Sequence, residues 1–202
     1  MKVEYDEIHG AGIVLQLDCP DLAMSGHMLG ETLEDFRARA RVNIEAIDRA
    51  TADIPPEDMR MHLCWGNYEG PHHHDVALRD IIDIVFEARP AAISFEAANP
   101  RHEHEWAVFE DVKLPEGKVL IPGVLDSTTN YIEHPELVAQ RIMRYARLVG
   151  PENLMAGSDC GFATFASYLT VDPGITWAKL RAMAEGAALA SAELYSGRGA
   201  RA

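Results

Sequence analysis

The 202-residue sequence lacks several features that identify a protein class at once. It contains only three cysteines, Cys19, Cys64 and Cys160, which are far apart and odd in number. A secreted disulfide framework is therefore not expected, and a reducing cytosol fits better. No apolar run approaches the about 18 residues that a membrane span needs, and the acidic N-terminal stretch has no signal-peptide pattern. We expect a cytoplasmic protein without a membrane-spanning segment.

Basic residues are also scarce, with 18 Lys and Arg against 32 Asp and Glu and a formal net charge of -14. A chain without a basic stripe has little to hold a nucleic acid or an anionic membrane, so neither partner is expected. The plainest explanation of the acidic balance is solubility. Hydrophobic residues make up 48% and charged residues 25%, which is typical of a globular chain. No repeat or linker divides the sequence, so residues 1–202 are predicted to form a single catalytic-type domain.

Short apolar runs alternate with longer amphipathic stretches along the chain. Strands are predicted at residues 13–18, 59–65, 91–95, 118–125 and 153–157. Helices are predicted at residues 32–50, 75–88, 135–149 and 176–195, the third with Pro135 at its first position. The strand runs are continuously apolar rather than alternating, which is typical of strands buried on both faces of a parallel sheet covered by helices.

Two α/β architectures are compatible with five β/α units. One is a doubly wound open sheet, and the other is a (β/α)8 TIM barrel, which normally needs about 250 residues. Five units cannot close an eight-stranded barrel. On the barrel reading, the chain is therefore a partial barrel.

Every predicted strand ends in a polar or metal-capable side chain. Chemistry in parallel α/β folds collects at the carboxyl ends of the strands, so five such ends suggest one shared site. The strand-end residues are Asp18 with Cys19, His62 with Cys64, Glu96, Asp126, and Asp159 with Cys160.

Four of these side chains form a candidate metal site. Residues two apart on a strand point to the same side, so His62 and Cys64 can bind one ion, while Glu96 and Cys160 end other strands. Two thiolates, an imidazole and a labile carboxylate suit zinc. The alternative is that the cysteines are inert core residues and His62 is a satisfied core histidine, because the spacing is not that of a zinc finger.

The charge of this ligand set indicates the chemistry. Two thiolates and one carboxylate around Zn²⁺ give an electron-rich zinc that activates water poorly. Such a zinc is suited to holding a substrate thiol as a nucleophilic thiolate at neutral pH. The thiol can displace Glu96, which leaves more easily than a cysteine. The pattern predicts alkyl transfer to sulfur rather than hydrolysis.

Three segments, "MHLCWGN", "ISFEAAN" and "GSDCGF", in that order and spacing, resemble the zinc-binding segments of the cobalamin-independent methionine synthase superfamily. That superfamily includes epoxyalkane:coenzyme M transferases, and its fold is shared with uroporphyrinogen decarboxylase. The resemblance extends from "VLQLDCP" to "AGSDCGFAT". It implies a TIM-barrel fold and zinc bound by His62, Cys64, Glu96 and Cys160. It also implies that Asp18 helps to hold the substrate through the amine of an amino-acid thiol.

The chain departs from the family pattern in two respects. The methionine synthases have an Asp-x-His pattern in which the histidine is thought to assist proton movement, whereas here Thr128 follows Asp126 at that position. This favours a divergent branch. Family members also close a full barrel, while this chain covers about the last five β/α units. We expect either a truncated sequence or a partner chain that supplies the remaining units.

Further polar residues lie in the loops after these strands. His72 and His73 are candidates for substrate contact or proton transfer, and Arg101 for pairing with a carboxylate, sulfonate or phosphate. Asn67 is expected to shape the substrate pocket. The alternative is that the histidines are solvated loop residues.

Two more strand-end residues have expected roles. Asp126 is a candidate for catalysis or substrate contact. Asp159 is expected to point away from the site and to hold a neighbouring loop, and Cys19 to face a helix, because adjacent strand residues point to opposite faces.

Three functional hypotheses follow from these residues and the resemblance. The first is a zinc-dependent thiol S-methyltransferase that resembles 5-methyltetrahydropteroyltriglutamate–homocysteine S-methyltransferase. The second keeps the zinc thiolate but takes an epoxide or another alkyl donor and a small thiol such as coenzyme M. The third is an inactive fragment, or a split-barrel subunit that needs a partner chain. Decarboxylation, as in the related fold, is disfavoured because metal-ligand residues are present where that chemistry needs none.

Overall fold

The computed structural model describes residues 1–24, 30–167 and 169–196, and its core is one parallel sheet. The strands lie in the order β1-β2-β3-β4-β5. They are β1 (Leu15–Cys19), β2 (Met59–Leu63), β3 (Ala92–Phe95), β4 (Val119–Leu125) and β5 (Gly157–Ser158). A doubly wound sheet reverses its strand order at a switch point, whereas a (β/α) barrel keeps sequence order. The observed order is that of a barrel, and the predicted α/β class is confirmed.

The chain divides into two compact units. The first unit consists of Met1–Gly66, Gly70–Phe95 and Leu114–Leu120. The second unit consists of Asn67–Glu69, Glu96–Lys113 and Ile121–Ala202.

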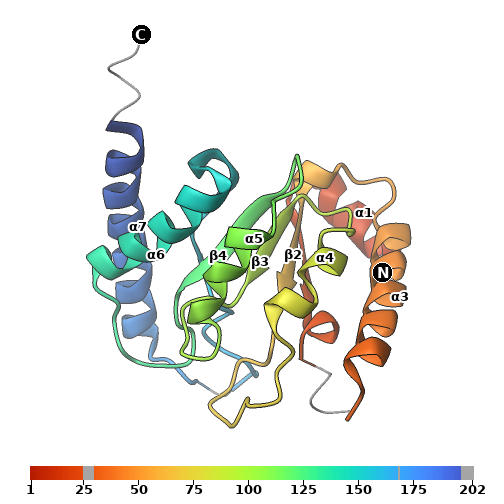
Figure 1. The fold of residues 1–202 in the computed structure, drawn as a ribbon, viewed down its shortest axis with the longest axis horizontal. Coiled ribbons are helices and arrows are strands. Elements are labelled where there is room, and N and C mark those ends of the chain that lie inside the picture. The colour runs from red at the N-terminus through yellow and green to blue at the C-terminus, as the bar shows by residue number, and fades with distance from the viewer. Residues whose placement is uncertain (25–29, 168, 197–202) are drawn as a thin grey trace. The chain divides into compact units, whose positions relative to one another are not determined.

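Helix α3 (Leu33–Ala50) of the first unit forms where the sequence predicts it (Figure 1). Its N-cap is Thr32, whose Oγ1 accepts a hydrogen bond from the Asp35 amide at 3.2 Å. Such a cap satisfies one of the amides that a helix start leaves without an intrahelical partner. The buried residues Phe36, Ala40 and Ile44 recur every four positions, so one face of α3 packs inward.

The strands of the first unit differ in how deeply they are buried. Four of the five residues of β2 are buried, as expected for a strand covered on both faces. β1 instead alternates, with Gln16 and Asp18 exposed between buried neighbours. The prediction of continuous burial is therefore wrong for β1, which is the first strand of the sheet.

The predicted helix at residues 75–88 is wrong. The structure has only a 3-10 turn, η3 (Leu78–Asp80), and the four-residue helix α4 (Ile82–Val85) in this stretch. The indole Nε1 of Trp65 donates to the Val76 carbonyl at 2.7 Å, which occupies an acceptor that a helix would use. A tertiary contact thus replaces the helical hydrogen bond that the sequence pattern favours.

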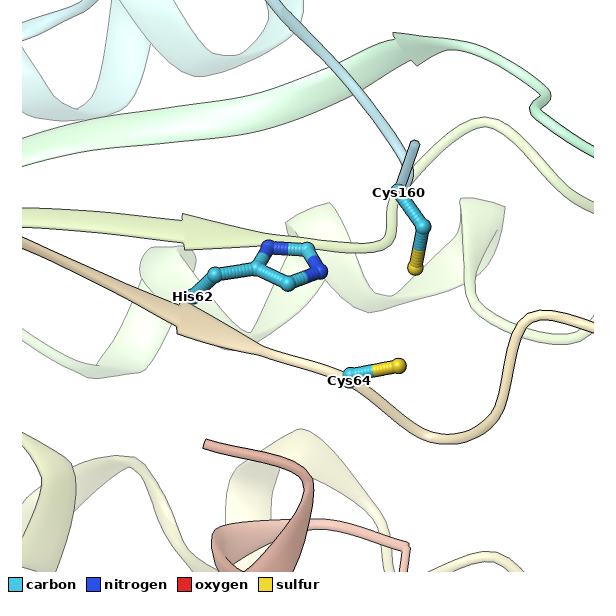
Figure 2. A group of neighbouring side chains, drawn as sticks. All are labelled: His62, Cys64 and Cys160. Atoms are coloured by element: carbon cyan, nitrogen blue, oxygen red, sulfur yellow. The ribbon is translucent and has the colours of Figure 1, made fainter. Parts of the chain in front are cut away.

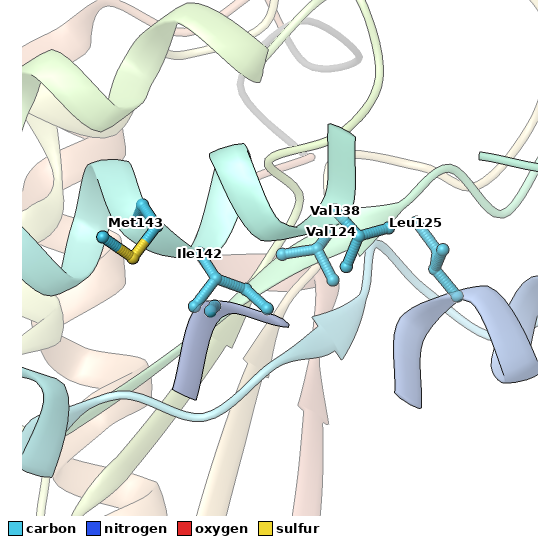
Figure 3. Close-up of a cluster of buried hydrophobic side chains, with 6 residues drawn as sticks. Val124, Leu125, Val138, Ile142 and Met143 are labelled. Atoms are coloured by element: carbon cyan, nitrogen blue, oxygen red, sulfur yellow. The ribbon is translucent and has the colours of Figure 1, made fainter. Parts of the chain in front are cut away.

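In the second unit, helices α6 (Pro135–Val149) and α7 (Pro173–Ser196) pack against each other and against β4. α6 matches its prediction, and α7 begins three residues before the predicted start. Figure 3 shows the apolar cluster at this interface. Its buried members are Val124, Leu125, Val138, Ile142, Met143 and Ala190. No helix within the described ranges combines the length and apolar character that a membrane crossing needs.

Other boundaries differ from the sequence prediction. The strand predicted at residues 153–157 is reduced to β5, because Gly150 ends α6 at a φ of 86° and the 3-10 turn η5 (Pro151–Asn153) follows. The segment that enters β5 is therefore irregular until Gly157. The elements that the sequence did not predict include α1 (Lys2–Gly10), η4 (Glu103–Ala107) and α5 (Val108–Asp111).

Gly186 sets the close approach of α6 and α7. A Cβ added there would lie 2.5 Å from the Val138 Cβ and 2.6 Å from the Pro135 carbonyl oxygen. Gly186→Ala should therefore lower the free energy of unfolding by about 1–3 kcal/mol, although alanine favours a helix by about 1 kcal/mol. Urea unfolding measures this change. The control is Ala184→Leu at an exposed position of α7, where an equal loss of stability would contradict the packing argument.

Candidate metal centre

In the first unit, His62 lies on β2, and Cys64 directly follows the last residue of that strand. One ring nitrogen of His62 and the Sγ of Cys64 lie within 4.8 Å of each other, as expected for residues two apart in an extended segment. The imidazole Nδ1 of His62 is 3.1 Å from the Ser94 hydroxyl, and Ser94 is the register partner of His62 on β3. A hydrogen bond at one ring nitrogen orients the ring and directs the other nitrogen to a metal. A metal bound by His62 would therefore take Nε2.

Glu96 and Cys160, the other two predicted ligands, belong to the second unit. Glu96 is 1% exposed, and its Oε2 accepts hydrogen bonds from Asn99 Nδ2 at 2.8 Å and Arg101 Nη2 at 2.7 Å. Its other oxygen, Oε1, lies 3.6 Å from the Cys160 Sγ. The carboxylate is therefore oriented, with one oxygen held by Asn99 and Arg101 and the other facing the thiol.

Three of the four predicted ligands form a group. One ligand atom each from His62, Cys64 and Cys160 lies within 4.8 Å of the others, and Figure 2 shows these side chains. Glu96 is outside this group but contacts Cys160. Two ligands at about 2.0 and 2.3 Å from one tetrahedral zinc lie about 3.5 Å apart, close to the Glu96–Cys160 separation. The donor types and this spacing fit zinc.

Asp18, the predicted substrate-binding and catalytic residue on β1, is the register partner of His62. Its side chain is accessible, yet partial desolvation raises the pKa of its carboxyl, an effect increased by Cys64 and opposed by His62. Cys19 is buried, and burial raises the pKa of its thiol to about 12. Cys19 is therefore a buried core cysteine, while the role of Asp18 stays a prediction.

Asp126 is bound by its own loop. Its Oδ1 accepts from the Thr128 amide at 3.0 Å and the Thr128 hydroxyl at 2.9 Å. Its Oδ2 accepts from the Thr129 hydroxyl at 2.7 Å. Both carboxylate oxygens thus accept hydrogen bonds from Thr128 or Thr129. The predicted role of Asp126 toward a substrate stays a prediction.

Asn67 connects the segment after Cys160 to the loop after β4. Its Nδ2 donates to the Gly161 carbonyl at 2.7 Å and to the Thr164 hydroxyl at 2.9 Å, and its Oδ1 accepts from the Ser127 hydroxyl at 2.8 Å. The Ser127 oxygen also accepts from the Cys160 amide at 3.1 Å. Asn67 therefore supports the backbone around Cys160, and its predicted contact with substrate remains untested.

The loop residues predicted to meet substrate also have neighbours in the structure. His72 is buried, with Nδ1 3.0 Å from Asp75 Oδ2, whereas His73 is exposed and its ring centroid lies 4.0 Å from that of His74. Arg101 binds Glu96 and donates from Nε to the Asn99 side chain at 3.1 Å. The predicted substrate roles of His72, His73 and Arg101 stay predictions.

Asn99 and Arg141 belong to the site and were missed by the sequence analysis. Asn99 lies in the quoted "ISFEAAN" segment, but nothing in that segment distinguishes an amide that binds the glutamate from a loop residue. Arg141 of α6 is buried and donates to the carbonyls of Val124 and Ala98, each at 3.0 Å. The helical pattern around Arg141 in the sequence does not indicate that its side chain binds these carbonyls.

A buried ion pair supports the loop after β4. Lys179 of α7 is 0% exposed, and its Nζ lies 2.9 Å from Glu133 Oε2. The Glu133 Oε1 also accepts from the Asp126 amide at 2.9 Å. The pair thus connects α7 to the residue that follows β4.

Lys179→Met should lower the free energy of unfolding by about 3–5 kcal/mol, because it leaves the Glu133 carboxylate buried without its cation. Urea unfolding measures the loss. The control is Arg49→Met, which removes the exposed Arg49–Glu45 pair and is expected to change stability little. Similar losses in the two variants would show that burial of the Lys179 pair is not important.

Comparison with known proteins identifies relatives of limited sequence identity. The 2-hydroxypropyl-CoM lyase of Xanthobacter autotrophicus is 26% identical over 176 residues, covering 75% of this chain and 45% of that protein. A methionine synthase of Methanothermobacter thermautotrophicus is 26% identical over 163 residues, covering 80% of this chain and 44% of that protein. The chain therefore spans less than half the length of these curated relatives.

A solved structure supports the fold. It is a B12-independent methionine synthase from Shewanella sp. W3-18-1 in complex with selenomethionine, with a TM-score of 0.72 over 96% of this chain and 53% of that chain. At 20% identity this similarity concerns the fold alone, and it agrees with the predicted barrel family. The family model for the catalytic domain of cobalamin-independent synthase matches residues 1–188. The chain belongs to the cobalamin-independent synthase catalytic-domain family of enzymes.

Proposed function

We propose that this chain is the thiol-activating part of a zinc-dependent S-methyltransferase of the methionine-forming type. The observation that carries the proposal is the cluster of His62, Cys64 and Cys160 ligand atoms within 4.8 Å of one another. Membership of the cobalamin-independent synthase family supports it. We further propose that residues 1–202 act as one catalytic-type domain, equivalent to the C-terminal part of a methionine-synthase-like barrel.

The proposed roles follow from the donor chemistry. His62, Cys64 and Cys160 would hold the metal, and Glu96, whose Oε1 lies 3.6 Å from the Cys160 Sγ, would be the fourth ligand. When bound, zinc supplies the positive charge that keeps an acceptor thiol ionised near neutral pH. Arg101 and Asn99 hold Glu96 Oε2 at 2.7 and 2.8 Å, so the carboxylate has partners at the oxygen that faces away from Cys160. Those contacts stabilise the glutamate as an anion whether or not it is a ligand.

The chain's remaining candidate residues have the following proposed roles. Asp18 is proposed to bind the amine of an amino-acid thiol, and Asp126 and His73 to take part in proton movement. Asn67, His72 and Arg101 are proposed to contact substrate. Since the chain spans less than half of its curated relatives, we propose that the alkyl-donor site also uses residues outside this chain or from a partner chain.

A second candidate is alkyl transfer from an epoxide or another alkyl donor to a small thiol such as coenzyme M. Two observations favour it. Thr128 stands in place of the histidine of the methionine synthases and binds Asp126. In addition, a 2-hydroxypropyl-CoM lyase is among the relatives. The zinc ligands and the thiol-activating step are the same for both candidates, so the acceptor thiol distinguishes them.

Purified chain should contain about one zinc ion per molecule by elemental analysis. Cys160→Ser should reduce zinc retention strongly, because a hydroxyl is a poor replacement for a thiolate ligand. The matched control is Cys19→Ser, which changes another buried cysteine that we do not propose as a ligand. Equal zinc retention by Cys160→Ser and the unmodified chain would exclude Cys160 as a ligand.

Addition of the acceptor thiol should change the zinc coordination, replacing the Glu96 oxygen with a sulfur. X-ray absorption at the zinc edge measures this change, with homocysteine and coenzyme M as the two probes. A new zinc–sulfur distance with homocysteine alone supports the methionine-forming type, and one with coenzyme M alone supports the second candidate. An unchanged spectrum with both thiols would count against thiol activation.

A further inference from the structure

We propose that Asp159 is a positioning residue that holds the segment Ala97–Asn99 and thereby aims the Glu96 carboxylate at Cys160. This inference rests on the proposed function, because it assigns Asp159 a role in shaping the ligand set. Asp159 is itself not proposed as a ligand.

The carboxylate of Asp159 is 1% exposed and accepts four hydrogen bonds. Its Oδ1 accepts from the amides of Ala97 and Ala98, both at 2.8 Å. Its Oδ2 accepts from the amide of Asn99 at 2.9 Å and from the Asn99 Nδ2 at 2.8 Å. All four contacts are N–H donors, as a buried ionised carboxylate requires. Three consecutive amides that follow Glu96 therefore depend on one side chain.

Asn99 connects Asp159 to Glu96 through hydrogen bonds of its side chain. Its Nδ2 donates both to Asp159 Oδ2 and to Glu96 Oε2, each at 2.8 Å. Its Oδ1 accepts from Arg101, which also binds Glu96 Oε2. With Oε2 held in this way, Oε1 is the oxygen that faces the Cys160 Sγ at 3.6 Å.

Asp159 is also bound to β4 through its backbone. The Asp159 amide donates to the Leu125 carbonyl at 2.9 Å. A Cβ added at Gly123 of β4 would lie 2.0 Å from Asp159 Oδ1 and 2.7 Å from its Cα, so only glycine leaves room for this carboxylate. Since Cys160 is the next residue, the segment after β5 that carries the thiol and the loop that carries Glu96 are both bound to Asp159.

The guanidinium of Arg141 also binds the segment Ala97–Asn99, at a carbonyl rather than an amide. It donates to the Ala98 carbonyl at 3.0 Å, while Asp159 accepts from the Ala98 amide. The peptide groups next to Glu96 are thus bound on both their donor and acceptor sides. Such binding goes beyond what a solvent-exposed connecting loop needs and is typical of support for a functional side chain.

Asp159→Asn tests the inference, because an amide keeps the shape but replaces an acceptor oxygen with a donor facing N–H groups. We expect about a 10–100-fold loss of zinc affinity, the range typical of residues that support metal ligands. In the metal-free chain, amide hydrogen exchange at Ala97, Ala98 and Asn99 should be at least about tenfold faster. The matched control is Glu105→Gln, a buried carboxylate of the same unit that pairs with His102 at 2.8 Å.

Asn99→Ala is the second variant and covers the case in which Asp159→Asn does not fold. The variant removes the hydrogen bond from Asn99 to Glu96 but keeps the contacts of the Ala97 and Ala98 amides with Asp159. Zinc affinity should fall while exchange at those two amides stays slow. The cobalt-substituted proteins add a spectroscopic readout, because a displaced Glu96 changes the visible absorption of cobalt bound at this site.

The outcomes separate the inference from the proposed function. Unchanged zinc affinity and cobalt spectrum in both Asp159→Asn and Asn99→Ala would overturn the positioning role. So would a loss of zinc affinity in Glu105→Gln as large as that in Asp159→Asn, because the effect would then reflect lost stability. If the unmodified chain binds no zinc, the proposed function is wrong, and slow exchange in Asp159→Asn would then reject the anchor as well.

Discussion

Burial of one carboxyl group, that of Asp159, is the constraint on which much of the second unit depends. Burial raises the pKa of the Asp159 carboxyl, and hydrogen bonds from Ala97, Ala98 and Asn99 oppose that rise. A carboxylate without such donors would be costly in this position. The backbone after β3 has to present its amides to Asp159, and β4 has to carry glycine opposite it. The course of this loop and the orientation of Glu96 thus depend on one buried carboxyl group and its four N–H donors.

The polar side chains at and after the strand ends bind other protein groups, which the sequence does not reveal. Asp126, Asn67 and Arg101 were predicted to meet a substrate, yet each has protein partners within hydrogen-bond distance. Buried polar groups need such partners whether or not they act on a ligand. Polar residues at strand ends therefore do not by themselves distinguish groups that contact a substrate from groups that bind other parts of the protein.

The sequence was sufficient for the alternation of strands and helices because burial periodicity is a local property. It predicted α3 and α6 closely, where a Thr cap and a first-position Pro mark the helix starts. It failed at residues 75–88, where the Trp65 indole takes a backbone carbonyl, and at residues 153–157, where a Gly150 turn delays the strand. Both failures involve contacts or backbone angles that a residue pattern does not specify.

The sequence by itself determined the donor types of the candidate metal centre and the placement of His62 and Cys64 on one side of β2, because residue identity fixes donor chemistry and strand geometry has a period of two. Tertiary structure alone decided which atom of each donor is presented. Ser94 binds the Nδ1 of His62, and Asn99 and Arg101 bind Oε2 of Glu96. Which atom is presented depends on these hydrogen-bond partners. Ser94 is distant from His62 in the sequence, and Asn99 and Arg101 reach Glu96 only because the loop that carries them folds back.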